Sequence, residues 1–246
     1  RSGKLSGAHR SPGETRPKRR GWWPTMASRS CDLDAWGSLR DALPALSNPQ
    51  TAVRVGPVEA FEQNYGLILY RKRLDAEAKG DLDLGAVRDF ATVLVDGQPR
   101  GTLDRRLGQH RLATPLKQGD TLDLLVENMG RVNFGSAVPD EYKGLRREVR
   151  IGNDVLSQWQ VYPLPLNDLS TLPFHTGLDA KGPRFLRGGF TLSKVAGGSF
   201  IDMRGWSQGP GWSNGYHLGR YWKDRKSTRL NCRHFGNLYA VSCLKQ

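Results

Sequence analysis

The chain has 246 residues, of which 37% are hydrophobic and 25% charged, and its formal net charge at pH 7 is +13. Residues 1–30 carry +7 and residues 223–246 carry +5, which leaves +1 for residues 31–222. This nearly neutral middle argues against a nucleic-acid partner, because a folded nucleic-acid-binding domain needs a basic face. Separately, no apolar run approaches the ~20 residues of a membrane span.

Residues 1–31 are rich in Gly, Ser, Pro and Arg, a composition typical of a disordered or non-native basic tail. The basic cluster Arg16–Arg20 has no aromatic residues between its charges. We interpret it as a solvated or artefactual tail rather than a nucleic-acid-binding or targeting patch. No apolar segment of a signal peptide follows it, and the sequence leaves the cellular location open.

Residues 32–60 are predicted to form a linker that contains a short helix. The helix is expected over residues 32–44, where Leu39 and Leu43 lie along one side. Pro44 is expected to end it, because proline lacks the backbone N–H that continues a helix.

From residue 61 onward the pattern is that of β-strands. Residues 65–74 alternate between two faces, and Gly, Asn and Asp turns separate the later strand segments, which are predicted over 90–95, 121–126, 146–151 and 155–162. Short, regularly spaced strands with such turns favour a sandwich or jelly roll. We therefore predict a first β-sandwich over residues 61–167, followed by a linker over residues 168–184.

The β pattern resumes at residue 185, which predicts a partial second sandwich over residues 185–222. Asp96-Gly97 in the first region and Asn214-Gly215 in the second are both strong signals for a type I′ hairpin turn. In both cases three residues follow and then a second glycine. The repeat predicts two related β-domains in tandem, an all-β chain with basic, disordered ends.

After Trp222 the alternation stops, and residues 224–246 resemble translated sequencing-adaptor read-through. Residues 223–246 are therefore expected to be an artefactual tail. The three cysteines, Cys31, Cys232 and Cys243, have no metal-ligand spacing, so we expect neither a zinc site nor a disulfide framework.

Four segments together resemble glycoside hydrolase family 35, the β-galactosidases: Tyr65–Arg71, Asp123–Gly135, Lys143–Leu145 and Gly211–Trp222. The second segment is highly specific, and the resemblance covers residues 33–222 in the family's order. It implies the region that follows the family's catalytic barrel, which consists of two jelly-roll, galactose-binding-like sandwiches. The second sandwich would be truncated here.

The resemblance also implies a function. The longer enzyme would hydrolyse terminal, non-reducing β-D-galactosides by a retaining mechanism with two catalytic Glu residues. Those residues belong to the barrel, which is absent here, so the isolated chain is expected to be inactive. Its role would be structural and at the rim of the substrate site. Its partners would be the barrel of the same polypeptide and, through it, a galactoside, with no cofactor and no metal.

The chain departs from the family at the last hairpin, where Gly211-Trp-Ser-Asn-Gly215 replaces a strand with two more apolar positions. This change is expected to weaken the strand. The early end of the second sandwich is expected to leave an unpaired sheet edge and to favour aggregation.

Two groups of residues are candidates for substrate-rim or sugar contact. The first is Arg131, Asn133 and Phe134, since the family's corresponding loop lies near the barrel and its aromatic residue helps to close the sugar pocket; a domain-interface loop is the alternative. The second group comprises Trp212, Tyr216, Arg220 and Trp222, together with Trp206 and Tyr221. It could form a carbohydrate-binding face, but packing within the sandwich is favoured.

The acidic residues do not suggest catalysis in this chain. Glu127, Asp140 and Glu141 are interpreted as structural or loop carboxylates, and His217 as a turn residue without a ligand or base role. No catalytic residue is assigned. The alternative function is a free-standing carbohydrate-binding module.

Overall fold

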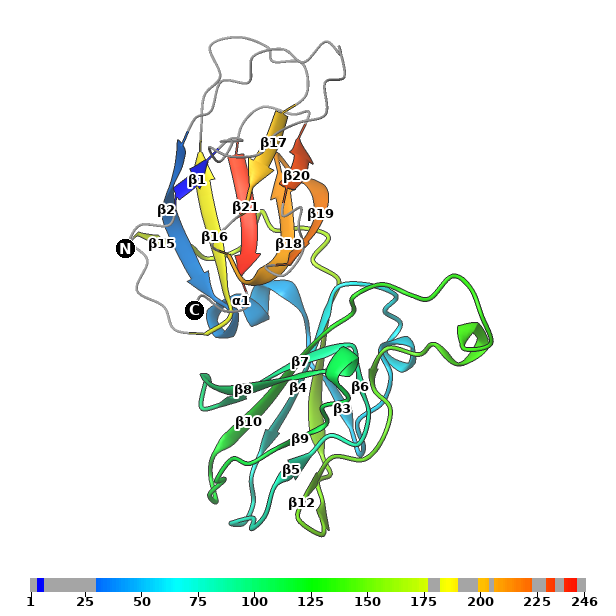
Figure 1. Ribbon diagram of the computed structural model, residues 1–246. Coiled ribbons are helices and arrows are strands. Elements are labelled where there is room, and N and C mark those ends of the chain that lie inside the picture. Colours follow the sequence, from blue (N-terminus) through cyan, green and yellow to red (C-terminus); the bar gives the residue numbers. More distant parts are fainter. Residues whose placement is uncertain are drawn as a thin grey trace, which may run out of the picture. The chain divides into compact units, whose positions relative to one another are not determined.

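The computed structural model describes residues 4–6, 30–176, 182–189, 199–203, 206–222, 229–232 and 237–242. All strand pairs within them are antiparallel, and α1 (Leu39–Leu46) is their one α-helix. The expected all-β fold is therefore confirmed. The chain divides into two compact units, which we describe separately: the central unit, Arg40–Leu172, and the terminal unit, Arg1–Leu39 with Pro173–Gln246 (Figure 1).

The central unit is built on a six-stranded sheet. Its strands are, in spatial order, β3 (Gln50–Ala52), β14 (Trp159–Leu164), β4 (Leu67–Arg73), β10 (Thr121–Glu127), β7 (Phe90–Val95) and β8 (Gln98–Asp104). Alternate side chains of these strands, such as Tyr70, Val93 and Leu124, enter one hydrophobic core. Arg71 and Asp123 lie at the intervening positions and so face away from this core.

Smaller sheets cover the core face. One has the order β13 (Asp154–Val155), β12 (Arg150–Ile151), β5 (Leu82–Asp83), β9 (Arg111–Leu112), and the other pairs β11 (Gly144–Leu145) with β6 (Val87–Arg88). Leu82, Ile151 and Leu145 from these strands join the same core. Three short 3-10 turns complete the unit: η1 (Val58–Phe61), η2 (Arg105–Leu107) and η3 (Val138–Asp140).

The terminal unit contains a nine-stranded sheet. Its strands are β19 (Tyr216–Trp222), β18 (Gln208–Ser213), β21 (Asn237–Ser242), β16 (Arg184–Gly189), β2 (Ser30–Ser38), β1 (Lys4–Ser6), β17 (Ser199–Asp202) and β20 (Arg229–Cys232), with β15 (His175–Thr176) also paired to β2. Strand β21 lies between β16 and β18 and pairs with both (Figure 1). Thus β18, whose Gly-rich sequence predicts weakness, has hydrogen-bonded neighbours on both sides.

The two hairpins that the sequence singles out have the same geometry. The turn residues have positive φ in both, at 52° and 77° for Asp96 and Gly97 and at 51° and 81° for Asn214 and Gly215. In each hairpin two cross-strand pairs follow the turn and then one residue bulges out. The pair after the bulge is Val93–Gly101 in β7–β8 and Gly211–Gly219 in β18–β19. The repeated glycine therefore marks the same position in both hairpins, next to the bulge.

The helix predicted over residues 32–44 is wrong in its first half. Residues Ser30–Ser38 form strand β2, which pairs with β1, β15 and β16. These partners come from segments remote in the sequence, and local periodicity cannot reveal them. The helix α1 runs over Leu39–Leu46 and includes Pro44 instead of ending there. In so short a helix, proline removes only the hydrogen bond that would reach the carbonyl of Arg40.

Two other segments contain more structure than expected. Residues 50–60, predicted as linker, supply strand β3 and the first three residues of the turn η1, and Val58 enters the core. Residues 223–246, predicted as an artefactual tail, include strands β20 and β21. Of the predicted N-terminal tail, Lys4–Ser6 forms β1, while the basic cluster Arg16–Arg20 lies outside the described residues.

Candidate functional site

The loop of residues 130–140, which follows strand β10, is exposed along its whole length. Phe134 is 91% exposed, the highest value among the large hydrophobic side chains of the described residues, and Val138 is 45% exposed. A phenylalanine so placed contributes little to the core of the unit that carries it. Exposed aromatic residues on a loop are a common feature of contact sites for ligands or other domains.

The start of this loop is held by Asn128. Its side-chain Nδ2 donates to the carbonyl oxygen of Asn64 at 3.0 Å, and its Oδ1 accepts from the backbone N–H of Gly130 at 2.9 Å. The next residue, Met129, donates its backbone N–H to Asp89 Oδ2 at 2.9 Å. The backbone carbonyl of Asn64 and the side chain of Asp89, from two other segments, thus fix the point at which the loop leaves the sheet.

Arg131 ties the start of the loop to its end. Its Nη1 donates to the carbonyl oxygen of Glu141 at 2.8 Å, and its Nη2 lies 2.6 Å from Glu59 Oε1. The Glu59 carboxylate also accepts from the backbone N–H of Lys143, 3.2 Å from each oxygen. Of the predicted group, Arg131 therefore anchors the loop, whereas Asn133 and Phe134 are exposed on it.

An ionic network adjoins the ends of the loop and comprises Asp89, Arg105, Glu141 and Lys143, of which Arg105 is 29% exposed and the other three are buried. Lys143 Nζ lies 2.8 Å from Asp89 Oδ2 and 2.6 Å from Glu141 Oε1. Arg105 Nη1 lies 2.7 Å from Asp89 Oδ1 and 2.7 Å from Glu141 Oε1. Both carboxylates are therefore shared by the same two cations, and Arg88 Nη1 lies a further 3.7 Å from Glu141 Oε2. Such pairing makes a buried charge tolerable.

The charges in this network determine what Glu141 can do. Its hydrogen bonds to Arg105, aided by Lys143 and opposed by burial, lower the pKa of Glu141 from 4.5 to about 2. The same hydrogen bonds raise the pKa of the Arg105 guanidinium. Glu141 therefore stays ionised at neutral pH and is unsuited to act as a general acid, for which a raised pKa is needed.

The segment Lys143–Leu145 packs against a buried tyrosine. The hydroxyl of Tyr70 donates to the carbonyl oxygen of Gly56 at 2.6 Å and accepts from the backbone N–H of Leu145 at 3.2 Å. Gly144 has φ +88°, and a Cβ on it would lie 2.5 Å from this hydroxyl. Only glycine satisfies both conditions, which explains the Lys-Gly-Leu sequence in physical terms. Burial raises the pKa of Tyr70.

The other acids named from the sequence have structural settings. Asp140 is exposed and forms an ion pair with Arg146, with Oδ1 2.6 Å from Nη2, and this hydrogen bonding lowers the pKa of Asp140. Glu127 is the buried last residue of β10, and its backbone carbonyl accepts from the N–H of Asp89.

The second predicted group lies on the hairpin β18–β19 in the terminal unit. Trp212 and Trp222 are each only 5% exposed, so packing rather than an open binding face accounts for them. Tyr216 is 57% exposed at the turn, and the Arg220 guanidinium lies 4.3 Å from the centre of the Trp222 ring. The pKa of His217 is lowered by burial. Tyr216 is thus the accessible aromatic residue of this group.

Sequence reasoning missed the residues that hold the loop in place, namely Glu59, Asp89 and Arg105. Lys143 was noted only as part of a motif. A buried lysine has no sequence signature, because its burial depends on acids 54 and two positions away along the chain. Among the described residues there is no group of three or more His, Cys, Asp or Glu that could hold a metal, and no helix suited to crossing a membrane.

Comparisons with known proteins agree for both units. Residues 57–165 match the family model "Beta-galactosidase, first all-beta domain", and residues 183–235 match "Beta-galactosidase, galactose-binding domain". The β-galactosidase of Xanthomonas manihotis is 40% identical over 200 residues, covering 80% of this chain and 32% of the relative. The bovine (Bos taurus) enzyme is 33% identical over 228 residues, covering 82% and 35%, respectively. The chain thus spans about a third of the length of these curated relatives.

Proposed function

The chain belongs to the β-galactosidases, of which it carries non-catalytic domains of the C-terminal region, and on that premise we propose that it is the accessory part of a galactoside-hydrolysing enzyme. The residue pattern of glycoside hydrolase family 35 supports a retaining reaction on terminal β-D-galactosides. The two catalytic glutamates would lie in a barrel of the same polypeptide. The isolated chain would be inactive, and its sandwiches would have jelly-roll topology.

Within that function, the loop of residues 130–140 contributes to the rim of the substrate site. The observation that supports this role is the 91% exposure of Phe134 on a loop whose two ends are fixed by Arg131 and the ionic network. An aromatic ring can stack on the apolar face of a sugar, and a fixed loop base reduces the entropy lost when it does so. Asn133 would supply a hydrogen-bonding amide beside the ring.

A chimaeric enzyme tests this role. The matching region of the Xanthomonas manihotis β-galactosidase is replaced by this chain, and hydrolysis of an aryl β-galactoside is measured. We expect activity in the chimaera, none in the isolated chain, and a loss of about tenfold in kcat/KM for Phe134→Ala, the effect of about 1.4 kcal/mol of binding. Phe134→Tyr should retain activity, and Val138→Ala on the same loop is the control.

Full activity in the Phe134→Ala chimaera would exclude the rim role and leave an interface role for the loop. Hydrolysis by the isolated chain would contradict the accessory role itself.

A free-standing carbohydrate-binding module remains the second candidate, and the exposure of Tyr216 is the observation that favours it. Titration of the chain with a galactoside, followed by NMR at Tyr216, decides between the two. Chemical-shift changes confined to this turn would support the module, and their absence would exclude it.

A further inference from the structure

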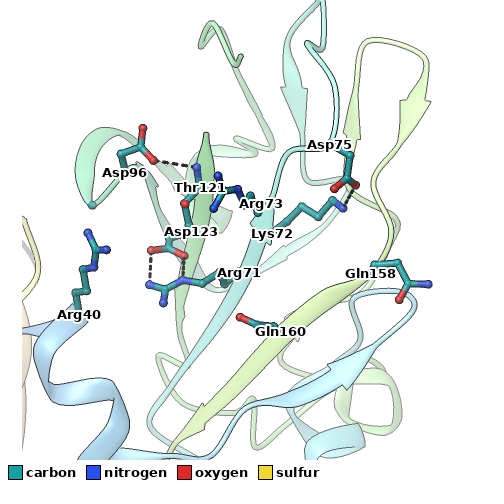
Figure 2. Close-up of a pocket in the computed structure, with 11 residues that line it drawn as sticks. Arg40, Arg71, Lys72, Arg73, Asp75, Asp96, Thr121, Asp123, Gln158 and Gln160 are labelled. Atoms are coloured by element: carbon teal, nitrogen blue, oxygen red, sulfur yellow. Dashed lines mark hydrogen bonds and ion pairs between the residues drawn. The ribbon is translucent and has the colours of Figure 1, made fainter. Parts of the chain in front are cut away.

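A polar pocket lies on the central unit, on the face of the six-stranded sheet that is turned away from the core. It has a volume of about 590 Å³. Figure 2 shows that its floor is formed by side chains of neighbouring strands, with Gln160 of β14 and Asp123 of β10 on either side of Arg71 of β4. On the same face, two residues further along these strands, Arg73 of β4 is paired with Thr121 of β10. The polar side chains thus form two rows across the sheet.

The centre of the floor is a preorganised ion pair. Arg71 Nε lies 2.7 Å from Asp123 Oδ1, and Arg71 Nη2 lies 2.8 Å from Asp123 Oδ2. This hydrogen bonding raises the pKa of Arg71, and the guanidinium also lies 5.6 Å from the centre of the Tyr162 ring. Because Arg71 and Asp123 hold each other in place, the N–H groups and carboxylate oxygens that can still bind a ligand keep a constant geometry.

The walls of the pocket carry an excess of positive charge. Lys72 is neutralised by its ion pair with Asp75, and Asp96 Oδ1 accepts from the backbone N–H of Thr121 at 3.0 Å. Arg40 and Arg73 are exposed, and within the described part of the chain neither forms an ion pair. The lining carries four cations and three carboxylates, a net charge of +1. Among the described residues, Arg40 and Arg73 are its two guanidinium groups outside an ion pair, and such groups bind planar anions through paired N–H donors.

The neutral groups beside these cations suit hydroxyl groups. The amides of Gln158 and Gln160 and the hydroxyl of Thr121 line the same pocket and can donate and accept hydrogen bonds. We propose that the pocket binds an acidic saccharide, a sugar unit that carries a carboxylate or sulfate. The anion would lie between Arg40 and Arg73, and the ring hydroxyls would lie against the two Gln residues. The sugar part of this inference rests on the proposed function, whereas the anionic part rests on the geometry alone.

Calorimetric titration of the whole chain at low ionic strength tests the proposal, because exposed arginines lose much of their attraction in salt. The probes are D-galacturonate, D-galactose and sodium sulfate. We expect galacturonate to bind with Kd of about 1 mM and at least tenfold more tightly than the other two. The double variant Arg40→Gln/Arg73→Gln should bind it at least tenfold more weakly. Arg100→Gln, an exposed arginine of β8 outside the pocket, is the matched control.

Circular dichroism of the double variant establishes that it folds, and the backbone NMR signals of Thr121 and Gln160 locate the binding. Three outcomes would overturn the proposal: no binding of galacturonate, equal binding by the double variant, or galactose binding as tightly as galacturonate. If sulfate alone binds as tightly as galacturonate, the pocket is a site for a bare anion, and the saccharide part of the proposal is wrong. Phe134 does not line the pocket, so Phe134→Ala should leave galacturonate binding unchanged. The proposal for the pocket and the proposal for the rim loop can therefore be rejected separately.

Discussion

Lys143 Nζ lies 3.0 and 2.8 Å from the two carboxylate oxygens of Asp89, and the two side chains are only 1% and 6% exposed. Asp89 also accepts from the backbone N–H of Met129, where the exposed loop begins, and Lys143 follows the point where it ends. A single buried ion pair therefore joins both ends of the loop that carries Phe134. The network acts as a positioning device rather than as a reactive centre, because its carboxylates are occupied by cations.

Substitution of Lys143 by methionine tests the importance of this pair. The variant Lys143→Met keeps the shape of the side chain but removes the buried cation. Asp89 is left with Arg105, and Glu141 with Arg105 and Arg88, whose side chains are 29% and 27% exposed. We expect the free energy of unfolding, measured by urea denaturation, to fall by about 3–5 kcal/mol. Lys79→Met, at an exposed position, is the control. A loss below about 1 kcal/mol would show that the pair contributes little.

Glu141 makes the stability of the chain depend on pH. Its pKa is about 2 in the folded state and ordinarily 4.5, so the folded state favours the ionised form. The resulting stabilisation is fully present above pH 4.5 and is lost as the pH falls through about 2. The stability difference between the wild type and Glu141→Gln should therefore be largest at neutral pH and shrink on acidification.

Urea denaturation at several pH values between about 7 and 2 measures this difference. The exposed Glu77→Gln, which removes a carboxylate outside the ionic network, serves as the reference. A constant difference for Glu141→Gln would contradict the assignment.

The two turn glycines should be intolerant of side chains for backbone reasons alone. Gly97 and Gly215 have φ of +77° and +81°, and a Cβ on either would have no neighbour within 4 Å. Alanine should therefore cost about 1–2 kcal/mol at each position, the penalty of the left-handed conformation. Gly56→Ala is the control, since its added Cβ would meet neighbours only at 3.6 Å or beyond and no positive φ is required. Equal stability of all three variants in urea would contradict this explanation.

The predictable parts of the fold are those that local sequence determines. The Asp96-Gly97 and Asn214-Gly215 turns and the strands β4, β7 and β10 follow from turn chemistry and alternation. Strand β2 was predicted in part as helix because its pairing partners lie far away in the sequence. Strands β20 and β21 were missed because residues 223–246 were interpreted as an artefactual tail.

The candidate site was predictable in location but not in construction. The resemblance identified Arg131, Asn133 and Phe134, and the structure places them on one exposed loop. It could not show that Lys143 is buried, because that depends on the folding of Asp89 and Glu141 around it. Among the aromatic residues of the second hairpin, Trp212 and Tyr216 look alike in sequence, and burial alone separates them.

The hydroxyl of Tyr70 should contribute to stability far more than that of an exposed tyrosine. Tyr70→Phe removes the acceptor for Leu145 N–H and the donor for the Gly56 carbonyl in the interior of the central unit. We expect a loss of about 1–3 kcal/mol in urea denaturation, because the buried N–H of Leu145 and the partly buried carbonyl of Gly56 lose their partner. Tyr65→Phe, which removes a hydrogen bond from an exposed hydroxyl to Asn167, is the matched control and should change stability by less than about 0.5 kcal/mol. Similar losses in Tyr70→Phe and Tyr65→Phe would show that burial does not determine how much a tyrosine hydroxyl contributes to stability.

Phe134 and Phe61 make a matched pair of phenylalanines in the central unit, at 91% and 9% exposure. Phe61→Ala should cost about 3–5 kcal/mol, because it leaves a cavity beside Tyr70, whose ring centre lies 6.3 Å from that of Phe61. Phe134→Ala should change the free energy of unfolding by less than about 0.5 kcal/mol, because its side chain buries almost nothing. Stability loss in Phe134→Ala would mean that the ring packs within its own unit, and any fall in activity of the chimaera could then be ascribed to unfolding. A stable Phe134→Ala with reduced kcat/KM would instead separate the two effects and assign the ring to contact outside the unit.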